Sequence, residues 1–88
     1  MLNRAGRAFS VRMLQAKTYA ALGKRLLQHQ AQAEVYVLQG SLPAAIEQLQ
    51  IAQSAGDGDF YQLSAVDARL RELRAQQLQL AREARKKN

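Results

Sequence analysis

Apolar residues recur every three or four positions through three stretches of this chain, with polar residues between them. This spacing is typical of amphipathic helices, because residues three and four apart share one face. It predicts helices at residues 8–22, 25–39 and 42–54. The predicted apolar faces contain Phe9, Met13, Ala16 and Ala20 in the first helix, Leu26, Leu27, Ala33, Tyr36 and Val37 in the second, and Leu42, Ala45, Ile46, Leu49 and Ala52 in the third.

Regularly spaced glycines mark the ends of these helices. Gly6, Gly23 and Gly40 are each 17 residues apart. Glycine is favoured just past a helix end, because it adopts left-handed backbone angles without steric cost. We therefore expect residues 1–7 to be the remnant of a preceding helix that ends at Gly6, and Ser41 to cap the third helix. The connections are so short that consecutive helices should be antiparallel neighbours.

A loop with two glycines and two aspartates, residues 55–59, precedes a long C-terminal helix. Asp59 followed by Gln62 resembles a capping box, so the helix should begin near residue 59, with Ser64 as a second possible start. It should run to about residue 85 and close the stack of helices with one apolar stripe. That stripe consists of Leu63, Val66, Leu70, Leu73, Leu80 and Ala84.

Composition limits the chemistry available to the chain. Its 88 residues suffice for one small domain, and the absence of cysteine excludes disulfides and thiolate metal sites. The net charge is +6, and residues 1–33 contain no acidic side chain. Such a charge favours acidic partners, including nucleic acid, a membrane surface or an acidic protein. An arginine-rich, acid-poor start is also found in mitochondrial transit peptides.

Residue types that carry catalysis or bind metals form no productive pattern in the sequence. The single histidine, His29, is expected to be a surface or packing residue, and one histidine cannot build a histidine-rich zinc site. Asp57 and Asp59 fit turn chemistry better than a calcium loop, which needs more oxygen ligands. The serines lack a nearby base. We therefore expect no catalytic, cofactor or metal site in this chain.

Small residues recur at the positions where two helices would approach closely. Ala33 and Ala45 are expected to face each other across the second and third helices. The whole spacing resembles that of the tetratricopeptide repeat, with departures at His29 and Gln32. The matching positions, in order, are Ala33, Tyr36, Gly40, Ala45, Leu49 and Ala52. The resemblance implies a single all-α domain over residues 1–88, with a remnant (1–7), a half repeat (8–24), a full repeat (25–54) and a capping helix (59–86).

A closer likeness covers residues 19–76. The segments AAIEQLQIA and GDFYQLSAVDARLRELRAQ resemble the C-terminal tetratricopeptide region of BepA-like bacterial zinc metallopeptidases. This resemblance implies a periplasmic location, contact with substrates or outer-membrane assembly proteins, and peripheral membrane association through a parent protein. The protease motif His-Glu-x-x-His is absent, since Gln30 follows His29. The chain would then be the non-catalytic part of a longer enzyme.

The function expected from these features is protein–protein interaction. Groove residues that could contact a protein or peptide partner are Lys24, Gln28, Gln32 and Gln39. The alternative is a free-standing basic helical module that binds nucleic acid or an anionic membrane. A third possibility is a short mitochondrial protein whose first residues are cleaved. Binding measured at low and physiological salt would distinguish the protein-interaction function from the basic-module alternative, because phosphate binding weakens steeply as the salt concentration rises.

Overall fold

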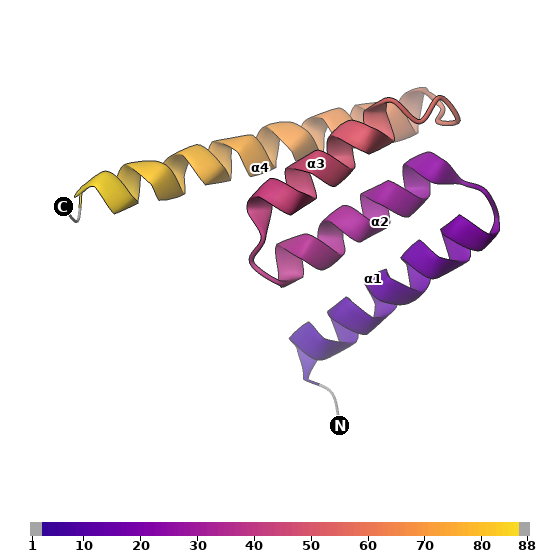
Figure 1. The fold of residues 1–88 in the computed structure, drawn as a ribbon, viewed down its shortest axis with the longest axis horizontal. Coiled ribbons are helices and arrows are strands. Elements are labelled where there is room, and N and C mark those ends of the chain that lie inside the picture. Colours follow the sequence, from indigo (N-terminus) through magenta and orange to yellow (C-terminus); the bar gives the residue numbers. More distant parts are fainter. Residues whose placement is uncertain (1–2, 87–88) are drawn as a thin grey trace.

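The computed structural model describes residues 3–86 and contains four α-helices and no strand in that part of the chain. The all-α fold class and the long final helix are therefore as predicted. The helices are α1 (Arg4–Ala21), α2 (Arg25–Leu38), α3 (Leu42–Gln53) and α4 (Phe60–Lys86) (Figure 1).

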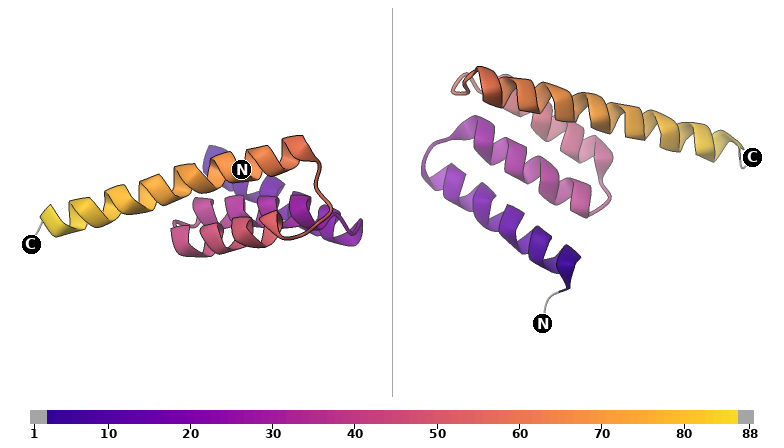
Figure 2. Two further views of the ribbon diagram at one scale, coloured as in Figure 1. Left: turned by 90° about the horizontal axis from the view of Figure 1, so that it is seen from above. Right: turned by 180° about the vertical axis from the view of Figure 1, so that it is seen from behind.

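The helices pack in the order in which they follow along the chain. α1, α2 and α3 lie side by side and alternate in direction, while α4 returns along one side of α3 and extends well past it (Figures 1 and 2). α1 packs on α2, α2 on α3, and α3 on α4, and a smaller contact joins α2 to α4. Among the described helices, α1 therefore touches α2 alone.

Two nearly identical turns connect the first three helices. After α1, Gly23 has φ +70°, and the N–H of Lys24 donates to the carbonyl oxygen of Tyr19 at 2.9 Å. After α2, Gly40 has φ +74°, and the N–H of Ser41 donates to the carbonyl oxygen of Tyr36 at 2.9 Å. This is the Schellman arrangement, which satisfies carbonyls at a helix end. The helix breaks predicted at these two glycines are confirmed.

The first helix begins earlier than predicted. It was expected at residue 8, with Gly6 ending a preceding helix, but α1 begins at Arg4 and Gly6 lies inside it. The reason is Asn3, whose Oδ1 accepts a hydrogen bond from the N–H of Gly6 at 2.7 Å and so caps the helix. The prediction for Gly6 is wrong, and residues 1–2 of the expected remnant lie outside the described residues.

Capping chemistry was predicted correctly for α4 but not for α3. Asp59 Oδ1 accepts from the N–H of Gln62 at 2.8 Å, and Gln62 Oε1 accepts from the N–H of Asp59 at 3.1 Å, which confirms the capping box. The helix is continuous from Phe60, so the alternative start at Ser64 is wrong. Ser41 occupies the cap position of α3, but its side chain makes no capping hydrogen bond.

The hydrophobic core lies between α2, α3 and α4, and alanines are among its fully buried members. Ala33 on α2 and Ala45 on α3 are 0% exposed, as are Leu49 and Ala52. Tyr36 is half-buried and packs against this cluster. The other buried members are Leu26, Leu42, Ile46, Val66, Leu70 and Leu73. A buried alanine fills little space, so large side chains can interdigitate beside it.

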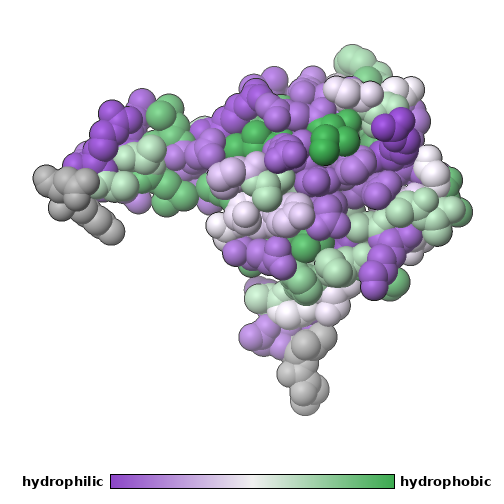
Figure 3. Space-filling view, viewed as in Figure 1, coloured by the Kyte–Doolittle hydropathy of each residue, from purple (hydrophilic) through white to green (hydrophobic). Residues whose placement is uncertain are grey.

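The apolar stripe of α4 packs over only part of its length. Val66, Leu70 and Leu73 are buried, but Leu80 is 52% exposed and Ala84 is also exposed. All of residues 74–86 are exposed, because α4 continues past the end of α3 into solvent. In the space-filling view this projecting end carries apolar side chains among hydrophilic ones (Figure 3). The predicted stripe positions Leu80 and Ala84 therefore do not pack against the stack, which ends at Leu73 on this face of α4.

Candidate protein-binding groove

A groove runs between α1 and α2. Its volume is about 190 Å³. α1 contributes Met13, Ala16, Lys17 and Ala20, and α2 contributes Gln28 and Gln32. Ala16 is buried and Met13 is half-buried, so the floor is apolar, while the two half-buried glutamines provide amide groups at one side. No acidic side chain lines it.

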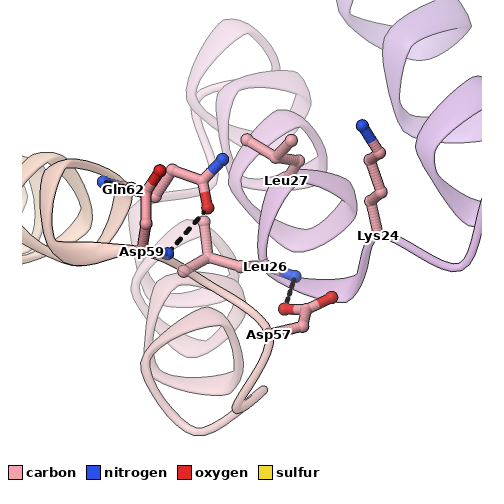
Figure 4. A pocket seen from close by; sticks show the side chains of 6 residues that line it. All are labelled: Lys24, Leu26, Leu27, Asp57, Asp59 and Gln62. Atoms are coloured by element: carbon pink, nitrogen blue, oxygen red, sulfur yellow. Dashed lines mark hydrogen bonds between the residues drawn. The ribbon is translucent and has the colours of Figure 1, made fainter.

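The structure brings together two of the four residues predicted to contact a partner. Gln28 and Gln32 lie one helical turn apart in the groove. Lys24 occupies the cap position of α2 and lines a different cavity, beside the loop that joins α3 to α4 (Figure 4). Gln39 is exposed at the C-cap of α2 and lines none of the three cavities described here. A predicted site made of all four residues is therefore reduced to the glutamine pair.

Asp57, from the loop before α4, caps the start of α2. Its carboxylate accepts a hydrogen bond from the backbone N–H of Arg25 at 2.6 Å. It accepts another from the N–H of Leu26 at 2.9 Å (Figure 4). The hydrogen bond from Leu26, followed by that from Arg25, lowers the pKa of Asp57, and the charge also suits the positive end of the helix dipole. The cap position itself holds Lys24, which makes no side-chain capping bond. A lysine at this position cannot accept the hydrogen bond of a cap, and this feature of the sequence could have indicated a cap from another segment.

The cavity around this loop has a volume of about 240 Å³, and the loop residues that line it stabilise the fold. Asp57 and Asp59 each cap a helix start, whereas the Lys24 side chain points away from both (Figure 4). Gly56 has φ +80°, and a Cβ on Gly58 would collide with the Cδ1 of Leu26. Both acids and both glycines of the loop thus have a folding role, which matches the turn chemistry predicted for the aspartates.

A second cleft, of about 450 Å³, lies where α2 meets α4. Arg69 donates two hydrogen bonds to Glu34, both of 2.9 Å, and a third to Glu72 at 3.0 Å. These contacts raise the pKa of Arg69, with the hydrogen bond to Glu34 as the main cause. Arg12 of α1 lines the same cleft. Because Glu34 is two positions from Gln32, it points about 200° away around α2, so this cleft and the glutamine groove lie on different faces.

No residue cluster in the described chain fits a metal. His29 Nδ1 lies 2.8 Å from Gln48 Oε1, an interaction that joins α2 to α3. Groups of three or more His, Cys, Asp or Glu side chains able to hold a metal ion do not occur within residues 3–86. None of the four helices has the length and apolar character to cross a membrane.

Basic residues on α1 point in several directions. At about 100° per residue, Arg7 points away from buried Ala16, while Arg12 and Lys17 lie on opposite flanks of it. Arg12 and Lys17 are therefore separated from Arg7, which shares the outward side of α1 with Arg4. Comparison with protein-family models, with curated proteins and with solved structures finds no significant match for this chain.

Proposed function

We propose that this chain is a non-catalytic protein-interaction module built from tetratricopeptide-like helical hairpins, and that a peptide segment docks in the α1–α2 groove. The observation that carries the proposal is the pairing of an apolar floor, around Met13 and Ala16, with Gln28 and Gln32 at its side. A glutamine amide both donates and accepts hydrogen bonds, as a peptide backbone does. This combination suits a protein segment that presents a row of apolar side chains on one side, either as a helix or as an extended chain.

The rigidity of the scaffold supports the same proposal. Schellman turns at Gly23 and Gly40 and the cap from Asp57 hold α2 at both ends. A groove whose walls are fixed before binding requires little ordering of the receptor when a partner arrives. Stacked helices with small residues at their contacts are used by repeat proteins to present such surfaces.

The setting proposed for the module follows from its sequence resemblance. Residues 19–76 resemble the C-terminal region of BepA-like zinc metallopeptidases, so the module would dock substrates or partner proteins for an attached periplasmic protease. In that role hydrolysis belongs to the parent enzyme, which associates with the membrane periphery. The chain itself contributes recognition and takes no part in the chemistry.

The rival function is a basic module that binds nucleic acid or an anionic membrane, and the net charge of +6 favours it. Two observations favour the peptide role instead. The basic side chains of α1 are spread around the helix, and the groove lacks the aromatic side chains on which unpaired bases stack. Binding of phosphates would also depend steeply on salt.

Selection from a displayed library of extended peptides, followed by titration of a selected peptide, tests the proposal. We expect NMR shifts at Gln28 and Gln32, and a loss of affinity of about tenfold in the Gln28→Ala/Gln32→Ala double variant. The matched control is Gln50→Ala/Gln76→Ala, which removes two exposed glutamines elsewhere. Failure to select any peptide, together with steeply salt-dependent binding of a DNA oligonucleotide or anionic vesicles, would support the rival function.

A further inference from the structure

α1 is the edge helix of the layer, and its outward side is uncovered. It contacts α2 through the face that contains buried Ala16, and no other described helix touches it. On the opposite side Val11 is 54% exposed, Leu14 is 66% exposed and Leu22, at the C-cap, is 63% exposed. These residues belong to a single row, here named the outer stripe: Arg4, Arg7, Val11, Leu14, Thr18 and Leu22.

The outer stripe has the geometry of a helix contact. Its members follow one another at spacings of three or four residues, which places them along one side of α1 for its whole length. Side chains in such rows form the ridges that pack into the grooves of a neighbouring helix. The stripe covers nearly 20 residues, or about 27 Å at 1.5 Å per residue. It is therefore long enough to seat a helix of four to five turns.

Charge selects the kind of helix that fits. Arg4 and Arg7 occupy one end of the stripe. Residues 3–33 contain no acidic side chain, so nothing in this part of the chain neutralises them. In a parallel pair, a second copy would set its own arginines against these, which is unfavourable, and in an antiparallel pair they would face the uncharged Thr18–Leu22 end and meet no carboxylate. A complementary partner carries acidic residues beside an apolar stripe.

We infer that the outer stripe of α1 docks an acidic amphipathic helix of a partner protein, as the next helix in the layer. Val11, Leu14 and Leu22 bury the apolar side of that helix. Its carboxylates lie at the end that meets Arg4 and Arg7. This surface is distinct from the α1–α2 groove, since Gln28 and Gln32 lie on the far side of α1 from Val11 and Leu14.

Three synthetic helical peptides test the inference. Each has the same leucine stripe at three-four spacing and about 18 residues, and the flanking positions are glutamate in one, glutamine in the second and lysine in the third. We expect the glutamate peptide to bind, the glutamine peptide to bind about tenfold more weakly, and the lysine peptide to show no binding. Amide shifts in NMR spectra should appear at Val11, Leu14 and Thr18, with Gln28 and Gln32 unaffected.

Surface variants locate the contact without disturbing the fold, because every target is exposed. Val11→Gln/Leu14→Gln should lower the affinity for the glutamate peptide by about tenfold or more. The matched control, Leu78→Gln/Leu80→Gln, changes two exposed leucines on the projecting end of α4 and should leave affinity unchanged. Arg7→Glu should weaken the glutamate peptide and allow the lysine peptide to bind, whereas Arg82→Glu should do neither.

Three outcomes would overturn the inference. The first is equal binding of the glutamate and lysine peptides, which would remove the charge argument. The second is sedimentation as a dimer that Val11→Gln/Leu14→Gln abolishes, since the occupant would then be a second copy. The third is binding to phosphatidylcholine vesicles with about 30% phosphatidylserine that depends on Val11 and Leu14, without binding of the glutamate peptide, because the stripe would then face a membrane. None of these results bears on peptide binding in the α1–α2 groove, which the glutamine variants test separately.

Discussion

The carboxylate of Asp57 accepts a hydrogen bond of 2.9 Å from the backbone N–H of Leu26, a residue 31 positions earlier in the chain. The bond joins the loop before α4 to the first turn of α2, so one side chain links the connection between α3 and α4 to a helix in the middle of the layer. Removing the carboxylate leaves the N–H groups of Arg25 and Leu26 without this partner.

The first prediction concerns this cap. Asp57→Ala should lower the urea midpoint of unfolding, and Asp57→Asn should lower it less, because an amide oxygen still accepts one hydrogen bond. Glu47→Ala removes an exposed carboxylate on α3 and is the control. An Asp57→Ala midpoint no lower than that of Glu47→Ala would mean that the cap does not stabilise the fold.

Acid should remove the contribution of Asp57. Its pKa is lowered from 3.8 on folding, so the stabilisation is fully present above that value and is lost as the pH falls through the lower, folded-state pKa. The difference in stability between the natural chain and Asp57→Asn should therefore be constant near neutral pH and shrink below about pH 4. Urea unfolding of both proteins over this range measures it. A difference that grows towards acid pH would contradict the assigned direction of the shift.

A side chain at Gly58 should strain the same connection. The added Cβ of Gly58→Ala would collide with Leu26, which is 1% exposed and has little room to move. We expect a loss of about 1–3 kcal/mol in the free energy of unfolding, as for other overpacked sites. Ser64→Ala, on the exposed side of α4, is the control. If the collision is the cause, Gly58→Ala should be less damaging when Leu26 is replaced by valine.

The contact between α2 and α3 should be intolerant of larger side chains. Ala45 is 0% exposed, so Ala45→Leu should destabilise the protein by about 1–3 kcal/mol. Ala75→Leu makes the same change at an exposed position of α4 and should be nearly neutral. Thermal unfolding compares the two. An unchanged melting temperature for Ala45→Leu would show that the two helices do not approach closely there.

The pair Glu34–Arg69 should couple α2 to α4. The pair has two parallel hydrogen bonds of 2.9 Å each and is partly buried. It should therefore contribute more to stability than a typical surface ion pair. A double-mutant cycle with Glu34→Gln and Arg69→Met should give a favourable coupling of about 1 kcal/mol that decreases at high salt. The same cycle on Glu72 and Arg69 should give less, since Glu72 is more exposed. Equal coupling for the two pairs would contradict the importance of the bidentate geometry.

The sequence predicted the local features of this fold better than its long-range ones. Gly23 and Gly40 ended helices where expected because a left-handed residue and a Schellman turn are specified within six residues. The capping box of Asp59 and Gln62 is equally local. Gly6 was misassigned because its spacing matched the other two glycines, while Asn3 allowed the helix to start before it.

Contacts between distant residues were beyond the reach of spacing arguments. Asp57 was assigned to turn chemistry, which is correct, but its partners in α2 depend on how the loop folds back. Leu80 follows the periodicity of the buried stripe on α4, yet it is exposed because α3 ends earlier. Of the residues predicted to contact a partner, Gln28 and Gln32 share a groove, while Lys24 lines the cavity beside the α3–α4 loop.

The exposed segment of α4 after Leu73 has a geometric consequence. Residues 74–86 stay helical without tertiary support, and at 1.5 Å per residue they span about 20 Å. The end of this segment, at Lys86, therefore lies about that distance from the packed part of α4. Its side chains face solvent all round, so its helical form depends on backbone hydrogen bonds and local side-chain pairs rather than on packing.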